Sequence, residues 1–319
     1  MRTIGIDVSH ATLDLALLDS VHGPAPVEHT RLPNRVDDVA AAVVWIRART
    51  PDLIVLEATG PYHAPLLATL AVTELAVALV NPARIKAYRQ SQGGRHKTDR
   101  ADAALLACFA RDHAADLRRY VAPPAAQARL RALVTYRDGL LARRTEVGNQ
   151  RAAAHWQDAD ATVLAWLDAD LAALAERLRT VDRELTAALA ALPEAPVLLA
   201  MPGVGLHIAA AVLALMPVAV RGDAKAAAAW AGVHPHLEVS GQRSRSWLSK
   251  HGNARVRRYL YMGALVAVRH DPSLAAKYAG FCARGLPKQA ALCAIMHALL
   301  RRMMGRLKRF YAGLEPFQA

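Results

Sequence analysis

The spacing of hydrophobic residues over the first 113 positions predicts a domain of the α/β class. Short apolar runs are typical of strands, and apolar residues repeating every three or four positions are typical of helices. The expected strands are Thr3–Val8, Thr12–Leu18, Glu28–Leu32, Leu53–Glu57 and Leu75–Val80. The expected helices are Val36–Arg49, Tyr62–Val72, one that begins at Asn81-Pro82, and one from Thr98 to about His113. The first two strands should form a hairpin, and later strands alternate with helices.

The remainder of the chain has a helical pattern. Residues 125–192 contain no proline and few β-formers, so we expect two long helices with a break near His155–Asp160. Such helices pack as an antiparallel pair or as the seam of a dimer. Residues 197–315 indicate mostly helices, with an irregular region at Gly232–Gly252. We therefore expect three parts: an α/β domain (1–122), a helical coiled-coil arm (123–195) and a mostly helical second domain (196–319).

Charge suggests a polyanionic partner. The chain of 319 residues has a formal net charge of +13 and a pI near 10.1, which is typical of nucleic-acid-binding proteins. The alternative is a basic surface with no specific partner. The cysteines Cys108, Cys282 and Cys293 form no CxxC pair, so we expect neither a disulfide framework nor a zinc site. Asp7 and Asp14 inside the first apolar run argue against a signal peptide.

One uncharged stretch, Val197–Val220, is long enough to cross a bilayer. Prolines and glycines interrupt it, so a pair of buried helices joined by a tight turn is the better interpretation and no membrane partner is expected. Within it, Pro202-Gly203-Val204-Gly205 suggests a helix-hairpin-helix, in which Gly203 and Gly205 let backbone N–H groups bind DNA phosphates. A plain tight turn is the alternative.

Four acidic residues are the first candidates for chemistry. Asp7 and Glu57 stand in or at the end of apolar strands, where a carboxylate is costly unless it is paired or binds metal. Asp99 and Asp102 are three residues apart, on one side of a helix. Together they could hold two Mg²⁺ ions about 4 Å apart, an arrangement suited to chemistry at phosphorus.

The alternatives for these acids are ordinary ones. Asp7 could be a turn or cap residue, and Asp99 could favour the helix dipole. Lys97 and Arg100 could neutralise the acids without metal. Two further acids, Asp14 and Asp19, are interpreted as surface or turn residues.

Two basic segments lie in the second half of the chain. The segment Ser240–Arg258 holds no acid, and its basic residues are expected to contact phosphates: Arg243, Arg245, Lys250, Arg255, Arg257 and Arg258. The final helix, about Pro287–Gly313, carries basic residues near its end that suit the helix dipole and can touch phosphates. A serine could attack phosphorus. Four compete for that role on chemistry alone: Ser240, Ser244, Ser246 and Ser249.

These motifs resemble those of the DEDD-type insertion-sequence transposases, the one-ten family, and the related Piv-type DNA invertases. In the first domain the matching motifs are Gly5-Ile6-Asp7-Val8-Ser9, Leu56-Glu57-Ala58-Thr59-Gly60 and Lys97-Thr98-Asp99-Arg100-Ala101-Asp102-Ala103. Further along they are Met201-Pro202-Gly203-Val204-Gly205, Ala231-Gly232-Val233-His234-Pro235, Val239-Ser240-Gly241 and Ser249-Lys250-His251-Gly252-Asn253.

The resemblance implies a RuvC-like, ribonuclease-H-type first domain in which Asp7, Glu57, Asp99 and Asp102 bind Mg²⁺ or Mn²⁺. It implies that Ser240 is the nucleophile that attaches covalently to DNA. It also implies a homo-oligomer (a dimer or tetramer) with a site shared between subunits, a structured guide RNA in some relatives, and a cytoplasmic, nucleoid-associated protein of a bacterium. The sequence departs from the family pattern at His10, at Gln242-Arg243 and at His251.

The leading hypothesis is a DNA transposase or site-specific recombinase. One alternative is a hydrolytic junction-resolving nuclease, in which the same acids activate water and Ser240 only binds phosphate. The other alternative is a nucleic-acid-binding protein without catalysis.

Overall fold

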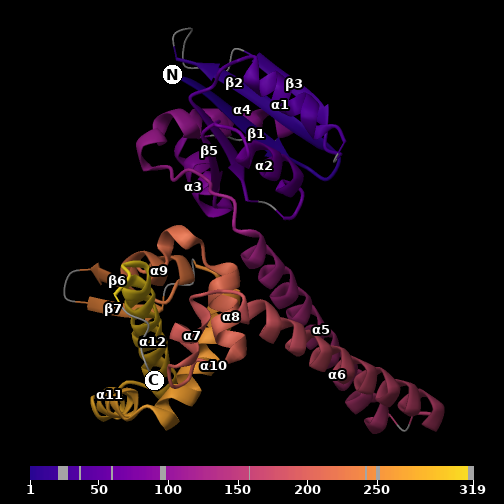
Figure 1. Cartoon of the computed structure of the whole chain (residues 1–319), viewed down its shortest axis with the longest axis vertical. Coiled ribbons are helices and arrows are strands. Elements are labelled where there is room, and N and C mark those ends of the chain that lie inside the picture. Colours follow the sequence, from indigo (N-terminus) through magenta and orange to yellow (C-terminus); the bar gives the residue numbers. More distant parts are fainter. Residues whose placement is uncertain are drawn as a thin grey trace. The chain divides into compact units, whose positions relative to one another are not determined.

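The computed structural model describes residues 1–20, 28–35, 37–58, 60–93, 98–157, 159–240, 243–248 and 252–314. These form two compact units, Met1–Ala122 and Pro123–Ala319 (Figure 1). The first is α/β and the second is helical apart from one hairpin, so the expected combination of an α/β part with a helical part is confirmed.

A five-stranded sheet forms the centre of the first unit. Its strands are β1 (Arg2–Val8), β2 (Thr12–Asp19), β3 (Glu28–Pro33), β4 (Leu53–Glu57) and β5 (Val77–Val80), in the order β3-β2-β1-β4-β5. β1, β2 and β3 pair antiparallel, whereas β4 pairs parallel with β1 and β5 parallel with β4. The parallel pairs bring the carboxyl ends of β1 and β4 to the same edge of the sheet.

Helices cover both faces of this sheet. α1 (Val39–Arg47) and α2 (Ala64–Ala71) pack on Ile4, Ile6 and their neighbours. α3 (Pro82–Ser91) and α4 (Asp99–Asp112) pack on Leu53, Val55 and Val80, on the opposite face. Asn81 and Thr98 cap α3 and α4 through their side-chain oxygens, as expected from their sequence positions.

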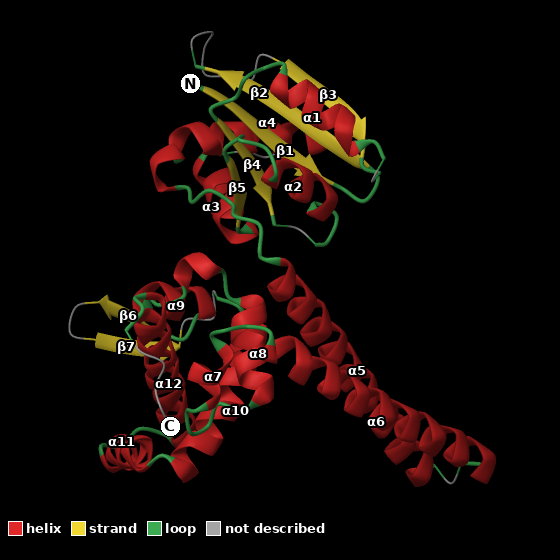
Figure 2. Ribbon diagram, in the orientation of Figure 1, coloured by secondary structure: helices red, strands yellow, loops and turns green. Residues whose placement is uncertain are grey.

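The second unit begins with two long helices, α5 (Ala125–Trp156) and α6 (Ala161–Ala190), which lie side by side (Figure 2). The shorter helices are α7 (Ala195–Leu199), α8 (Leu206–Leu215), α9 (Ala224–Ala231), α10 (Ala254–His270) and α11 (Pro272–Ala283). They are followed by α12 (Lys288–Tyr311).

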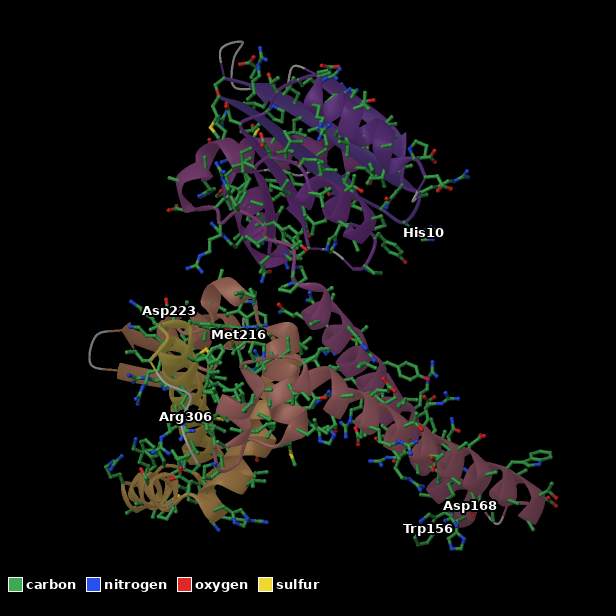
Figure 3. The ribbon with its side chains drawn as sticks, viewed as in Figure 1. His10, Trp156, Asp168, Met216, Asp223 and Arg306 are labelled. Carbon is green, nitrogen blue, oxygen red and sulfur yellow. The ribbon has the colours of Figure 1, made fainter. Side chains whose placement is uncertain are left out.

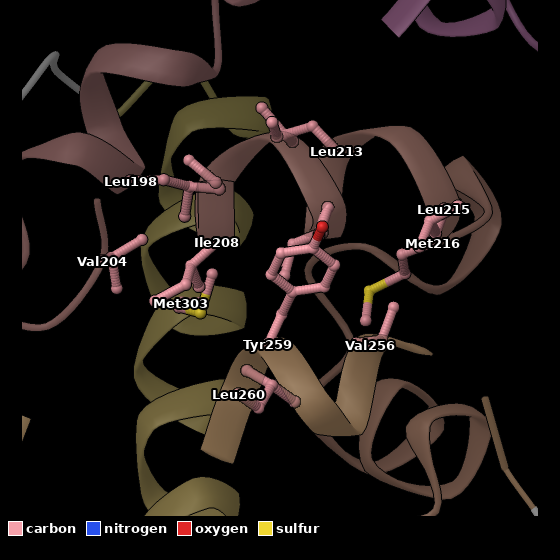
Figure 4. Packing of buried hydrophobic residues seen from close by; sticks show 14 of the residues in the cluster. Leu198, Val204, Ile208, Leu213, Leu215, Met216, Val256, Tyr259, Leu260 and Met303 are labelled. Carbon is pink, nitrogen blue, oxygen red and sulfur yellow. The ribbon is translucent and has the colours of Figure 1, made fainter. Parts of the chain in front are cut away.

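The uncharged stretch Val197–Val220 contains the end of α7 and all of α8, joined by a turn, so the expected pair of helices with a tight turn is confirmed. Every residue from Ile208 to Leu215 is buried, and α8 packs against α5, α6, α7 and α10. Figure 4 shows side chains of α10 and α12 around Ile208. Among the described residues, no helix combines the length and the apolar character that a membrane crossing requires.

The expectation of an irregular region at Gly232–Gly252 is wrong. Residues Pro235–Ser240 (β6) and Arg243–Leu248 (β7) form an antiparallel hairpin. His236–Ser240 alternates polar and apolar residues, whereas Arg243–Ser246 is polar throughout, so only β6 carries a strand pattern and the pairing with β7 appears only in the structure.

The close approach of α4 to β1 gives a test of the first unit. A Cβ added at Gly5 would lie 2.1 Å from the Ala103 carbonyl oxygen and 2.3 Å from the Ala107 nitrogen. Because both are helix backbone atoms, Gly5→Ala should destabilise the protein by about 2–4 kcal/mol, measured as a lower thermal unfolding midpoint.

Gly148→Ala is the matched control. It lies in α5 with no atom near its Cβ position, so it should be neutral or stabilise by about 0.5–1 kcal/mol. Equal unfolding midpoints for the two variants would contradict the packing described for Gly5.

Candidate functional site

Alternate residues of β1 face α4. The Thr3 hydroxyl donates to the Ala107 carbonyl oxygen at 2.8 Å, and Gly5 lies against the backbone of Ala103. Because strand side chains alternate between faces, Asp7 lies on the same face as Thr3 and Gly5, next to the N-terminal end of α4.

The first turn of α4 carries two of the predicted acids. The Thr98 hydroxyl accepts from the Ala101 N–H, which begins the helix so that Asp99 and Asp102 both lie in its first turn. Asp102 is 9% exposed, whereas Asp99 is exposed. Acids at this end also interact favourably with the helix dipole.

Glu57 lies on the same face of the sheet. Val55, two residues earlier in β4, packs with α4 residues, and the alternation of side chains puts Glu57 on that face too. The pairs Gly5↔Val55 and Ile6↔Leu56 place the ends of β1 and β4 side by side. Strand register therefore brings Asp7 and Glu57, 50 positions apart in the chain, to neighbouring strand ends.

The electrostatics of Asp7 show that these acids are near one another. Two causes together raise the pKa of Asp7 from 3.8 to about 6. The larger is burial, and the second is the negative charge of Asp102, Asp99, Glu57 and Asp14, in that order. The site therefore disfavours a fifth negative charge and favours a cation. The other three predicted acids, Glu57, Asp99 and Asp102, are therefore close enough to Asp7 to raise its pKa.

Asp14 is the acid that the sequence reasoning missed. It pairs directly with Asp7 across β1 and β2 and is 1% exposed, so its interpretation as a surface or turn residue is wrong. Asp19, interpreted in the same way, is 4% exposed and accepts from Arg2 Nε at 3.0 Å. The hairpin register could have revealed Asp14, because a tight connection at 9–11 sets position 7 opposite position 14.

Two arginines neutralise part of this acidic cluster. Arg31 in β3 donates from Nε to Asp14 and from a terminal nitrogen to Asp99, each at 3.0 Å. Arg89 in α3 donates to Asp102 at 2.7 Å. Sequence reasoning had named Lys97 and Arg100 for this role. Lys97 lies outside the described residues, and Arg100 lines a neighbouring cavity of about 370 Å³ with His29.

The acids fit a divalent metal by their donor chemistry. Asp7, Asp14, Glu57, Asp99 and Asp102 offer only carboxylate oxygens, the ligands that Mg²⁺ prefers. Burial and the neighbouring acids raise the pKa of Asp7, so a cation beside it would be favourable. In the part of the chain that the structure describes, no three His, Cys, Asp or Glu side chains already stand in a metal-holding arrangement. Asp99 and Asp102 would have to turn from their arginine partners to complete one.

The predicted nucleophile belongs to the other unit. Ser240 is the last residue of β6, and its pairing with Arg243 leaves two residues between the strands, so it lies at the end of the hairpin. Arg243 and Arg245 belong to β7. Lys250, His251 and Gln242 lie outside the described residues.

The arginines that follow the hairpin have protein partners. Arg255 and Arg258 both donate to the carboxylate of Asp138 in α5, at 2.9 and 2.6 Å, and the Tyr259 hydroxyl donates to it at 2.8 Å. Arg257 donates to the Ala231 carbonyl oxygen at 3.1 Å. Asp138 therefore fixes the start of α10, which follows the hairpin along the chain.

Gly203 and Gly205 lie in the turn between α7 and α8. Gly203 has a φ of +84°, and a Cβ there would lie 2.6 Å from the Ala267 Cβ, so packing alone requires glycine. Gly205 precedes the first residue of α8 and has no atom near its Cβ position.

Of the departures from the family pattern, His10 packs edge-on against Tyr62, with ring centroids 5.1 Å apart (His10 is labelled in Figure 3).

Comparison with protein families identifies matches in both units. Residues 4–154 match the IS110-type DEDD model described as "Transposase", and residues 195–279 match "Transposase IS116/IS110/IS902 family". Together the two models match most of the chain.

Individual relatives match shorter segments. An insertion element IS110 protein of Streptomyces coelicolor is 29% identical over 47% of this chain and 39% of its own length. The pilin gene-inverting protein of Moraxella lacunata is 34% identical over 33% of each chain. The chain therefore spans only about a third to two fifths of the length of these curated relatives.

Among solved structures, Thermus thermophilus RuvC in complex with a Holliday junction substrate covers 38% of this chain and 99% of its own, at 15% identity. The TM-score of 0.31 is too low for this likeness to assign a fold.

The raised pKa of Asp7 predicts a pH-dependent cost. The folded form holds the Asp7 proton more tightly than the unfolded chain, so stability should fall as pH rises from about 4 to about 6 and stay level above that. Asp7→Asn should remove this cost and stabilise the metal-free protein by about 1–2 kcal/mol at pH 7, less than the full shift implies because solvent screens the group. Thermal unfolding in EDTA between pH 4 and 7 measures it.

Asp116→Asn, at an exposed acid of the same unit, controls for the substitution itself. A stability difference between Asp7→Asn and the unmodified chain that stays constant from pH 4 to 7 would refute the assignment.

Proposed function

The chain belongs to the IS116/IS110/IS902 family of transposases, and from that membership we propose that it is an enzyme that cuts and rejoins DNA, as a transposase or site-specific recombinase. The observation that carries the proposal is geometric: strand register sets the ends of β1 and β4 side by side, and the capped first turn of α4 lies against β1. Burial, and after it the charges of Asp102, Asp99 and Glu57, raises the pKa of Asp7 in agreement with this arrangement. Acids distant in sequence gather where a phosphodiester enzyme needs them.

In this proposal the acids of the first unit hold Mg²⁺ or Mn²⁺. Divalent ions at these oxygens would position the scissile phosphate and stabilise the negative charge that develops at phosphorus. β1 and β4 fix Asp7 and Glu57 at neighbouring strand ends, and the capped first turn of α4 fixes Asp99 and Asp102. Arg31 and Arg89 pair with Asp99 and Asp102, and a bound cation would have to take the place of these arginines.

Ser240 is the proposed nucleophile. Its oxygen attacks phosphorus, the bond from phosphorus to the leaving deoxyribose oxygen breaks, and a phosphoserine ester links protein to DNA. Rejoining reverses these steps with a new deoxyribose oxygen as the attacking group. Support comes from the Val239-Ser240-Gly241 motif and from the position of Ser240 at the end of a hairpin rich in arginine.

The partners follow from the same premise. DNA fits the basic composition, and a homo-oligomer fits a site whose acids and serine belong to different compact units. A structured guide RNA is proposed from the family resemblance alone.

We also propose the ribonuclease-H-type fold for the first unit, supported by three antiparallel strands followed by two parallel ones. A bacterial cytoplasmic location, at the nucleoid, completes the proposal.

The test of Ser240 is to trap protein on DNA. End-labelled DNA carrying the element ends, incubated with the full chain and Mg²⁺ and then denatured, should yield a labelled covalent adduct. Ser240→Ala should abolish this adduct, because no oxygen remains at that position to form the ester.

Ser244→Ala and Ser246→Ala, both in β7, are the matched controls and should keep the adduct. An adduct that survives in Ser240→Ala would exclude this nucleophile. DNA cleavage with no adduct in any variant would instead favour the hydrolytic nuclease.

The metal is tested without catalysis. Mg²⁺ or Mn²⁺ at about 100 times its Kd should stabilise the folded protein by about 2.7 kcal/mol and raise the unfolding midpoint by several degrees, roughly 5–10 °C. Asp102→Asn should lose most of this rise, whereas Asp168→Asn, at an exposed acid of α6, should keep it. Equal metal-induced shifts in both variants would show that metal binds elsewhere.

A further inference from the structure

We propose that Arg31 binds the DNA phosphodiester at the acidic site once Asp99 has turned from it to a divalent cation, and that Asp14 is the positioning residue that keeps Arg31 in place during this exchange. The proposal deepens the proposed function and rests on it, because it assigns a further substrate-binding residue to the same site. Every residue that it uses belongs to the first unit.

Three of the charged residues lie abreast on neighbouring strands of the sheet. Asp7 in β1 is opposite Asp14 in β2, and Asp14 is opposite Arg31 in β3. The three strands lie side by side in Figure 2. Directly opposite residues of antiparallel strands point to the same face of a sheet, and α4 packs on β2 as it does on β1. Asp14 and Arg31 therefore share the α4 face with Asp7.

Asp14 is a firm anchor for Arg31. The Arg31 Nε lies 3.0 Å from each of the two carboxylate oxygens of Asp14, and His29 Nε2 lies 3.1 Å from one of them. Asp14 is 1% exposed. A carboxylate buried this deeply is destabilising without a charged partner, so the folded unit itself keeps Arg31 beside Asp14.

The bond from Arg31 to Asp99 is of a different kind. A terminal nitrogen of Arg31 donates to Asp99 at 3.0 Å, and each of the two side chains is 54% exposed. An ion pair so open to water contributes little to stability, because solvent screens it. Asp99 can therefore turn to a divalent cation at small cost, while the contact of Arg31 with buried Asp14 stays. The guanidinium then loses one partner and keeps the other.

The chemistry of the released guanidinium matches a phosphodiester. Arginine has five N–H donors in one plane, and Asp14 engages the donor at Nε. The terminal N–H groups can donate in parallel to two phosphate oxygens, at the site where negative charge develops in the proposed reaction. Because Asp99 occupies a terminal nitrogen in the absence of a cation, Arg31 should contribute to DNA binding only when metal is present.

Arg89 has no comparable anchor. Among the described residues it bonds to Asp102 alone, at 2.7 Å. When Asp102 turns to a cation, none of those residues holds the Arg89 guanidinium at the site. Both arginines can neutralise the acids, but only Arg31 is held in place to act afterwards.

The experiment compares two affinities of the full chain. One is the affinity for Mn²⁺ without DNA, measured by calorimetry. The other is the affinity for a labelled duplex that carries the element ends, measured by fluorescence anisotropy in EDTA and in Ca²⁺. Ca²⁺ also takes oxygen ligands and stands in for Mg²⁺, so that binding is measured without turnover.

Arg31→Gln should move the two affinities in opposite directions. It should bind Mn²⁺ about 2- to 5-fold more tightly, because Asp99 no longer has to leave an arginine. It should bind the duplex roughly 10-fold more weakly in Ca²⁺ and equally well in EDTA, because only a cation frees the guanidinium for phosphate. A purely structural role would weaken both affinities, and a general surface charge would weaken DNA binding in EDTA as well.

The control is Arg47→Gln, which removes the same charge from an exposed position of α1, on the opposite face of the sheet. It should leave the affinity for Mn²⁺ unchanged, together with the gain in DNA affinity that Ca²⁺ produces. If Arg31→Gln also leaves both unchanged, the proposal is overturned.

Asp14→Asn/Arg31→Gln tests the same site if the single substitution impairs folding by leaving Asp14 without its arginine. The double variant removes both charges of the buried pair, so the fold should tolerate it better, and it should show the same loss of DNA affinity in Ca²⁺. An unmodified chain that responds to neither metal would overturn the proposed metal site and this inference together. A response that the double variant shares in full would overturn the Arg31 assignment and leave the metal site standing.

Discussion

The close packing of α4 on β1 is the constraint on which the acidic site depends. Gly5 leaves no side chain between strand and helix, so the helix backbone can approach within contact of the sheet. The Thr3 hydroxyl, bonded to Ala107, fixes the helix along the strand. At that separation the first turn of α4 brings Asp99 and Asp102 near Asp7, and burial with like charge raises the pKa of Asp7 to about 6. Ionising a buried Asp7 among other acids costs free energy, and a group of residues that keeps such an unfavourable charge arrangement is typical of a functional site.

The sign of the clustered charges differs between the two units. In the first, Arg31 and Arg89 partly neutralise a group of carboxylates. In the second, one carboxylate can pair with two arginines: Asp138 accepts from Arg255 and from Arg258. Asp271 pairs with Arg302 alone. Both follow from the same rule, that a charge removed from water requires a partner. An enzyme acting on phosphodiesters needs both results, an acidic centre for cations and a basic surface for the nucleic acid.

Most of the secondary structure could be predicted because local patterns specify it. Asn81 and Thr98 cap helices, and the break between the long helices falls at 157–160, where polar residues follow Trp156. The β6–β7 hairpin escaped prediction because β7 carries no hydrophobic alternation and the alternation in β6 spans only His236–Ser240. The burial of Asp14 and Asp19 escaped for another reason: a lone acid in a strand gives no sign of whether an arginine from elsewhere will meet it.

The sequence by itself determined the class of the fold, the family motifs and the candidate acids, because each depends on residues close together in the chain or on composition. Only the tertiary structure decided which charges meet. Packing of α4 on the sheet gave Asp99 a partner in Arg31, and helix packing gave Arg255 and Arg258 a partner in Asp138. Electrostatic interaction depends on distance in space, and no spacing along the chain gives that distance.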